Sequence, residues 1–252
     1  MQRETRQLIQ HTFKNRRLFV LNGCQRVLQF IDPTNNQTRG MNLSNSTIVL
    51  IGGAPGTGKT TVGNLLVKEL GLSHHISTGF IRASIQHLLP PEKANLLKAH
   101  AFDAVDRLDS SGNSQTGGVL RGVLAQAEIL GESIHSCITR ASREGIGLVI
   151  EGSHLMADTV NIDSSDQVFL CVLDVPAREL LVERALSENH SKRQLSQWQL
   201  ARLLELQEEL VNRAHQSRVP VVINDTLEET IKNITRLIAQ KKPQYLSKTP
   251  KF

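Results

Sequence analysis

The segment GAPGTGKT at residues 53–60 matches the pattern G-x-x-x-x-G-K-[ST] of a phosphate-binding loop. Three glycines let backbone N–H groups turn toward a phosphate, and the helix expected to start near Lys59 directs the positive end of its dipole at the same charge. We expect Lys59, on the solvent side until phosphate arrives, to bridge the β- and γ-phosphates, and the Thr60 hydroxyl to ligate Mg²⁺. The residues predicted to bind ATP are Gly53, Ala54, Pro55, Gly56, Thr57, Gly58, Lys59, Thr60 and Thr61.

The rest of the chain narrows the class of nucleotide-binding protein. We find no N-K-x-D motif of the kind with which GTPases read guanine. AAA-type motors end the third strand with an Asp-Glu pair, whereas GLVIEG at 147–152 offers the single carboxylate Glu151. These absences leave small-molecule kinases.

Glu151 ends an apolar run that reads as a buried strand, where a carboxylate is costly unless a cation or hydrogen bonds accompany it. We therefore predict that Glu151 joins Thr60 at the Mg²⁺ ion or orients the attacking group. Arg82 is the leading candidate for binding an anionic acceptor, with an exposed first-turn arginine as the alternative. His154 either contacts substrate or satisfies its own loop, and Arg121 is a weaker acceptor-site candidate.

Basic residues also surround the helix-breaking segment SENHS. Arg184, Lys192 and Arg193 flank it, as in lids that bring arginines over a γ-phosphate, although a solvated helix end has the same pattern. Arg184 is our candidate for a catalytic arginine. Asn224 and Asp225 end the last expected strand, where they meet the adenine edge or serve a turn and helix cap.

These residues require an α/β scaffold in which short apolar strands alternate with amphipathic helices. The continuously apolar strands indicate a parallel sheet covered on both faces, so we predict a P-loop NTPase fold with five parallel strands flanked by helices. Strands are expected at 47–51, 74–76, 147–152, 167–174 and 219–225. Helices are expected at 59–70, 80–89, 119–144, 177–187, 195–217 and 227–239.

We predict three parts of the chain. Residues 1–45 read as a basic extension with a short helix, a hairpin turning at Asn22-Gly23 and a polar linker. Residues 46–240 form the kinase domain, and 241–252 form a basic tail.

Two segments, HHISTGFIRASI (74–85) and SREGIGLVIEGSHL (142–155), resemble the 2-phosphoglycerate kinase family. That family carries a P-loop, an I-S-T-D-x-I-R motif and an R-E-G…I-I-E-G-x-H-L motif in this order. ISTG-x-x-R is also similar to the ISTGD-x-L-R motif of adenylate kinases, but their later D-G-F-P-R motif is replaced here by EGSHL. The resemblance spans residues 47–225 and implies that Arg82 holds an anionic acceptor and that Arg184 is the lid arginine.

One position departs from this pattern. The Asp that the family places after Ser-Thr is Gly79 here, and the Asp that adenylate kinases place one residue later is Phe80. A carboxylate at this point would accept or orient the proton of an attacking hydroxyl. The change puts the acceptor in question.

Composition excludes several other classes. The 252 residues are 4% aromatic, which gives base-stacking surfaces little to build on, and no apolar run is long enough to span a membrane. The formal charge of +5 comes from the two ends, since residues 1–46 hold seven Lys/Arg against two acids and 240–252 hold four Lys, leaving −4 on the remainder. Three separated cysteines suggest neither disulfides nor zinc, so we expect a cytoplasmic protein. The low aromatic content and the acidic body between the basic ends make nucleic acid an unlikely partner.

The favoured function is transfer of the γ-phosphoryl group of Mg·ATP to a small anionic metabolite, most simply 2-phosphoglycerate or a similar phosphorylated acid. Two alternatives stay open. One is an ATP-binding regulatory module derived from a kinase, motivated by Gly79 and the basic extension. The other is a nucleotide or polynucleotide kinase. The oligomeric state is not indicated by the sequence.

Overall fold

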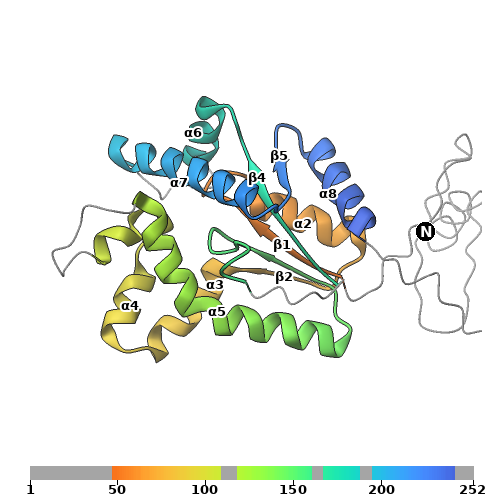
Figure 1. Ribbon diagram of the computed structural model, residues 1–252, viewed down its shortest axis with the longest axis horizontal. Helices are drawn as coiled ribbons and strands as arrows, with labels where there is room; N and C mark the ends of the chain where they lie inside the picture. Colours follow the sequence, from red (N-terminus) through yellow and green to blue (C-terminus); the bar gives the residue numbers. More distant parts are fainter. Residues whose placement is uncertain (1–46, 109–117, 161–166, 188–194, 242–252) are drawn as a thin grey trace, which may run out of the picture. The chain divides into compact units, whose positions relative to one another are not determined.

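The computed structural model describes residues 47–108, 118–160, 167–187 and 195–241 of the chain (Figure 1). The expected hairpin extension, the polar loop at 109–117, Lys192 and Arg193 lie outside these residues, as does all but the first residue of the basic tail. The predictions made for those segments, and the domain boundary near residue 46, stay predictions.

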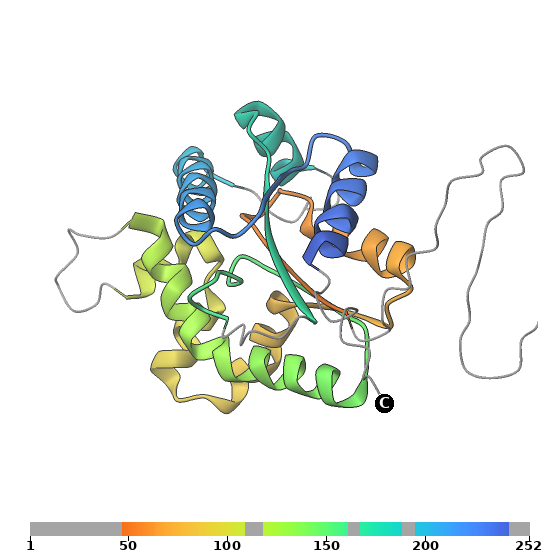
Figure 2. The same cartoon turned by 45° about the vertical axis from the view of Figure 1, so that its right-hand side comes forward.

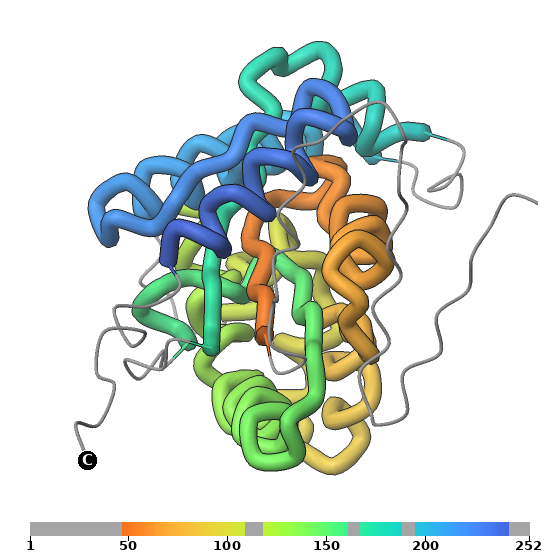
Figure 3. The backbone as a smooth tube through the Cα atoms, turned by 90° about the vertical axis from the view of Figure 1, so that its right-hand side faces the viewer, coloured from red at the N-terminus to blue at the C-terminus, as the bar shows by residue number. Residues whose placement is uncertain are grey.

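A parallel sheet of five strands forms the centre of the described part, as the sequence predicts. Its order is β2-β3-β1-β4-β5, and every neighbouring pair runs parallel. Figure 3 shows β1 in the middle with β3 and β4 on either side. The strands are β1 (Ile48–Gly52), β2 (His74–Ser77), β3 (Leu148–Glu151), β4 (Val168–Asp174) and β5 (Val221–Ile223). Parallel strands bring their carboxyl ends to one edge, where open α/β folds bind ligands.

Helices cover both faces of this sheet (Figures 1 and 2). They are α2 (Lys59–Leu70), α3 (Thr78–Ile85), α4 (Pro91–Lys98), α5 (Gly118–Glu144), α6 (Arg178–Leu186), α7 (Gln197–Gln216) and α8 (Leu227–Lys241). Two short 3-10 helices, η1 (Gln86–Leu88) and η2 (Ala101–Arg107), lie between α3 and α5.

Alternate residues of the central strand β1 belong to different layers of the core. Ile48 and Leu50 pack with α3 and α5 on one face, while Val49 and Ile51 pack with α2 and α8 on the other. All four side chains are fully buried. The strand is therefore apolar at every position, because both faces of the sheet are covered.

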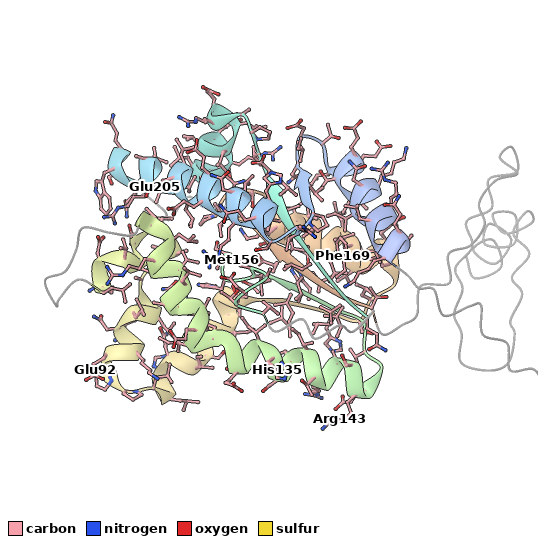
Figure 4. All side chains as sticks on the ribbon, in the orientation of Figure 1. Glu92, His135, Arg143, Met156, Phe169 and Glu205 are labelled. Atoms are coloured by element: carbon pink, nitrogen blue, oxygen red, sulfur yellow. The ribbon has the colours of Figure 1, made fainter. Side chains whose placement is uncertain are left out.

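A further apolar cluster contains buried residues of α5, α6 and α7 together with the P-loop residue Ala54. Figure 4 shows Met156 inside this region between α5 and α7, whereas Glu92, His135 and Arg143 lie at the outer surface. No helix of the described ranges is long and apolar enough to cross a membrane.

The region after β2 differs from the expectation of one helix at 80–89. Helix α3 begins earlier, at Thr78, because the Ser77 side chain accepts a hydrogen bond from the Gly79 N–H (3.0 Å) and caps the helix. It ends at Ile85, where η1 follows, and η1 stops at Leu88 because Pro90 disfavours a helical conformation of Leu89. Sequence reasoning also missed α4 and η2.

Candidate active site

The P-loop connects β1 to α2 through three glycines with positive φ angles. Gly53, Gly56 and Gly58 have φ of 139°, 88° and 84°, which other residues adopt only with strain. Gly58 is also the N-cap of α2, so no side chain stands in front of the first-turn N–H groups. This backbone can bind an anion with N–H groups and the helix dipole together.

Lys59 is buried (8% exposed), and its Nζ donates a hydrogen bond to the Ala54 carbonyl oxygen (2.7 Å). The expectation that this side chain faces solvent before phosphate arrives is wrong. The ammonium group instead lies folded over the loop, where Thr57 Oγ1 donates to the same carbonyl (2.9 Å). The charge is thus held at the phosphate position by the loop itself.

Side chains from distant parts of the chain hold the loop in place. Ser153, just after β3, donates to the Gly53 carbonyl (2.9 Å), and Gln207 of α7 accepts from the Ala54 N–H (3.2 Å). Both side chains are buried. Buried loop backbone needs such partners, because no water is available to satisfy it.

Asn224, at the end of β5, makes a third contact of this kind. Its Nδ2 donates to the Thr57 carbonyl (2.8 Å), and its Oδ1 accepts from Thr230 of α8 (2.9 Å). The side chain is 1% exposed. A Cβ on Gly58 would lie only 2.5 Å from its Nδ2, so the close approach requires glycine at this position. Asn224 therefore supports the P-loop, and because it also lines the cavity, the adenine contact suggested for it stays a prediction.

Thr60 and Glu151, which the sequence suggests as metal ligands, are in contact at the carboxyl edge of the sheet. Thr60 Oγ1 donates to Glu151 Oε1 at 3.1 Å, and Glu151 is 4% exposed. Hydroxyl and carboxylate oxygens are ligands that suit Mg²⁺. No cluster of three His, Cys, Asp or Glu side chains suited to a metal occurs in the described ranges, so phosphate oxygens and water would complete the coordination of any ion here.

A cavity of about 660 Å³ opens along this edge. The predicted phosphate-binding residues Pro55, Gly56, Gly58, Lys59, Thr60 and Thr61 line it. Gly53, Ala54 and Thr57 lie beneath and are buried. The cavity is also lined by α3, the start of η2 and the segment after β3. One space therefore joins the P-loop to the region where an acceptor was expected.

Both leading arginines line this cavity from different sides. Arg82 of α3 donates from Nη1 to the Ala99 carbonyl. Arg184 of α6 donates to the carbonyls of Asn224 (2.7 Å) and Asp225 (3.1 Å). Backbone carbonyl oxygens orient each guanidinium at the cavity.

The other two acceptor candidates differ in placement. Arg121, in the first turn of α5, does not line the cavity. His154 does, but its Nδ1 lies 2.9 Å from Thr78 Oγ1 and its Nε2 lies 3.0 Å from Gln126 Oε1. Both ring nitrogens thus have partners within the protein, which agrees with the loop-satisfying role weighed for His154.

Several lining residues escaped sequence reasoning. His100 and Phe102 lie at and near the start of η2, with rings 5.6 Å apart and stacked. They follow α4, a helix that no sequence pattern indicated, so no signal placed them near the P-loop. Gly79 also lines the cavity, while the side chain of Phe80 is 78% exposed.

Comparisons with known proteins bear on this geometry. No protein-family model matches the chain. A 2-phosphoglycerate kinase from Pyrococcus furiosus is 29% identical over 80% of this chain and 67% of its own length, and one from Pyrococcus horikoshii is 32% identical over 77% and 64%. The chain spans about two thirds of the length of these curated relatives.

Solved structures with a similar fold include a gluconokinase from Sinorhizobium meliloti (15% identity, 79% of this chain, 94% of that chain, TM-score 0.46). A shikimate kinase from Acinetobacter baumannii is similar at 14% identity over 79% of this chain and 95% of that chain, with a TM-score of 0.42. The sequence relatives, rather than these distant structures, identify the chain. It is therefore a homologue of the 2-phosphoglycerate kinases and belongs with them among the P-loop kinases.

Proposed function

We propose that this protein transfers the γ-phosphoryl group of ATP to a hydroxyl of a small phosphorylated acid, with 2-phosphoglycerate as the favoured acceptor. One observation carries the proposal: a single cavity is lined by the P-loop on one side and by Arg82 on the other. The curated relatives named 2-phosphoglycerate kinase support the choice of acceptor.

The nucleotide side of the cavity would hold the β- and γ-phosphates. The N-terminus of α2 supplies N–H groups, and Lys59 supplies a charge that moves from the Ala54 carbonyl to a phosphate oxygen. Arg184 lines the cavity from α6, whose residues Leu181 and Ala185 pack beside Gly56 of the P-loop, and its charge would stabilise the transferring group.

Thr60 and Glu151 would hold a Mg²⁺ ion, which would neutralise the negative charge that develops on the phosphates. The chain itself contributes the buried carboxylate and the hydroxyl at fixed separation. When the acceptor hydroxyl oxygen bonds to the γ-phosphorus, the bond to the β–γ bridging oxygen breaks and ADP leaves. The hydroxyl proton then needs a base, and Glu151 is the carboxylate nearest to the P-loop that lines the cavity.

On the acceptor side, Arg82 would bind the carboxylate or phosphate of the acceptor. A guanidinium matches these planar or tetrahedral anions with paired N–H donors. The His100 ring also lines this side. An anionic acceptor therefore fits the part of the cavity that presents the Arg82 cation.

Nucleotide binding is tested with Lys59→Ala against Lys68→Ala, an exposed lysine of the same helix. ATP with Mg²⁺ at 100 times its dissociation constant should stabilise the wild type by about 2.7 kcal/mol. Lys68→Ala should keep this stabilisation and Lys59→Ala should lose it, while both fold without nucleotide. Absence of a shift in the wild type would overturn ATP binding.

The acceptor is tested by ADP release with 2-phosphoglycerate, glycerate, AMP and a 5′-hydroxyl oligonucleotide. We expect turnover with 2-phosphoglycerate that exceeds the rate with the other three. Preference for AMP or the oligonucleotide would indicate a nucleotide or polynucleotide kinase. Stoichiometric ATP binding without turnover on any acceptor would favour a regulatory module, which the replacement of a family Asp by Gly79 motivates.

A further inference from the structure

A chain of buried hydrogen bonds runs from the wall of the cavity, which Thr78 and His154 line, into the protein interior. It runs from Thr78, the first residue of α3, through His154 to Gln126 of α5. All three side chains are buried, with 1%, 4% and 0% exposed, respectively. The P-loop chemistry described above uses none of them.

The direction of these bonds follows from Gln126. Its Nε2 donates to the carbonyls of Leu96 (2.8 Å) and Ala99 (3.1 Å), so its Oε1 is the atom that faces His154 and must accept. His154 therefore carries its proton on Nε2. The unprotonated Nδ1 then accepts from the Thr78 hydroxyl.

A neutral imidazole gives this pattern, whereas a protonated ring would donate from both nitrogens and reverse the bond to Thr78. Burial lowers the pKa of His154 to about 3, with further lowering by the positive charges of Arg82 and Lys59. The ring consequently stays neutral at physiological pH, and the direction of the chain is preserved.

The two ends of the chain reach opposite walls of the acceptor side. Thr78 lies at the start of α3, the helix that carries Arg82. A Cβ on Gly152 would be 1.7 Å from Thr78 Oγ1, so Thr78 packs directly on the segment after Glu151. At the other end, Ala99 O accepts from both Gln126 and Arg82. His100 follows immediately and lines the cavity.

We propose that Thr78, His154 and Gln126 form a positioning relay that fixes Arg82 and the start of η2 for acceptor binding. The relay rests on the proposed function, in that the part of the cavity away from the P-loop takes the acceptor. Its members act through Arg82 and the backbone at Ala99, so they are positioning residues. The relay adds a second hydrogen-bonded link between α3 and the α4–η2 junction, beside the direct bond from Arg82 to the Ala99 carbonyl.

The main test is Gln126→Met, because Gln126 is fully buried and does not line the cavity. Steady-state kinetics should show an acceptor KM raised about tenfold with the ATP KM changed by less than twofold, as expected when a buried hydrogen-bonded group loses its partners. A purely structural role would lower stability or affect both substrates alike. Equal changes in both KM values, or no change, would overturn the relay.

Thr78→Val and Thr78→Ser form a matched pair that is less demanding for folding. Val keeps the shape but removes the donor to His154, whereas Ser keeps the hydroxyl. We expect Thr78→Val to raise the acceptor KM about tenfold and Thr78→Ser to remain within threefold of wild type. Equal acceptor KM values for the two variants would show that the hydrogen bond is not needed.

A spectroscopic measurement separates failure of the relay from failure of the proposed function. Imidazole ¹⁵N NMR should show His154 as the neutral Nε2–H tautomer from pH 5 to 8 in the wild type. A protonated ring or an Nδ1–H tautomer would overturn the relay whatever the acceptor. If the wild type does not phosphorylate 2-phosphoglycerate, the proposed function fails, and the relay is then decided by NMR and by the binding of inorganic phosphate to the wild type and to Gln126→Met. Weaker phosphate binding by the variant would support the relay, and equal binding would overturn it.

Discussion

The P-loop side and the acceptor side of the cavity are built in different ways. On the P-loop side, the backbone N–H groups and the lysine that would touch phosphate lie within eight consecutive residues, and side chains such as Ser153 and Asn224 support their backbone. On the acceptor side, the lining comes from α3, η2 and the segment after β3, linked by His154 and Gln126. Phosphate recognition can be local because it uses backbone N–H groups, whereas an acceptor of defined shape needs side chains from several elements.

The comparison predicts that the largest losses follow from removing charge on the nucleotide side. Arg184→Ala should lower kcat by roughly 10³-fold with little change in ATP affinity, because an arginine over the transferring group acts in the transition state. Arg178→Ala is the control, since this arginine of the same helix forms an exposed ion pair with Glu208. If single-turnover measurements gave both variants the wild-type rate, Arg184 would only hold the backbone at the end of β5 and would not act in catalysis.

Glu151→Gln should follow with a loss of about 10²-fold in kcat and a higher Mg²⁺ requirement. The amide keeps an acceptor for Thr60 but loses the charge that would face the metal or the hydroxyl proton. Glu144→Gln, at the exposed end of α5, is the control. A Mg²⁺ titration with unchanged midpoint and rate would remove Glu151 from the reaction.

A smaller effect is expected from the support beneath the P-loop. Asn224→Ala leaves the buried Thr57 carbonyl without its donor, so ATP affinity should fall about tenfold and unfolding free energy by about 1–3 kcal/mol. Asn233→Ala on the surface of α8 is the control. Titration calorimetry and urea denaturation measure both quantities. Unchanged affinity in a destabilised variant would show that the loop keeps its shape without Asn224.

The same contrast explains what the sequence revealed. The sheet, α2 and the pair of Thr60 and Glu151 were predictable because each depends on local pattern or on strand ends meeting at one edge. The roles of Gln126 and Gln207 were not, since a glutamine within an amphipathic helix gives no signal of the distant carbonyl or N–H that it meets. The buried position of Lys59 likewise depends on how its own loop folds back.

The last prediction concerns position 79, where the acceptor side departs from the family pattern. A Cβ on Gly79 would meet only Ser77 Oγ, at 3.1 Å, and Gly79 is not among the glycines with positive φ, so the backbone accepts a side chain there. The position is in the first turn of α3, where a carboxylate also suits the helix dipole. Gly79→Asp is therefore expected to fold.

Its effect on kcat/KM has opposite signs for two kinds of acceptor. If the attacking group is a hydroxyl, the new carboxylate assists its deprotonation and raises kcat/KM by roughly 3- to 10-fold. If the attacking oxygen is already ionised, no base is needed, and the added charge repels the anion and lowers kcat/KM by a similar factor. Gly79→Asn adds nearly the same bulk without charge and separates the two causes. Since 2-phosphoglycerate is phosphorylated at a hydroxyl, the proposed function requires the increase, and equal values for Gly79→Asp, Gly79→Asn and wild type would place residue 79 outside the reacting part of the cavity.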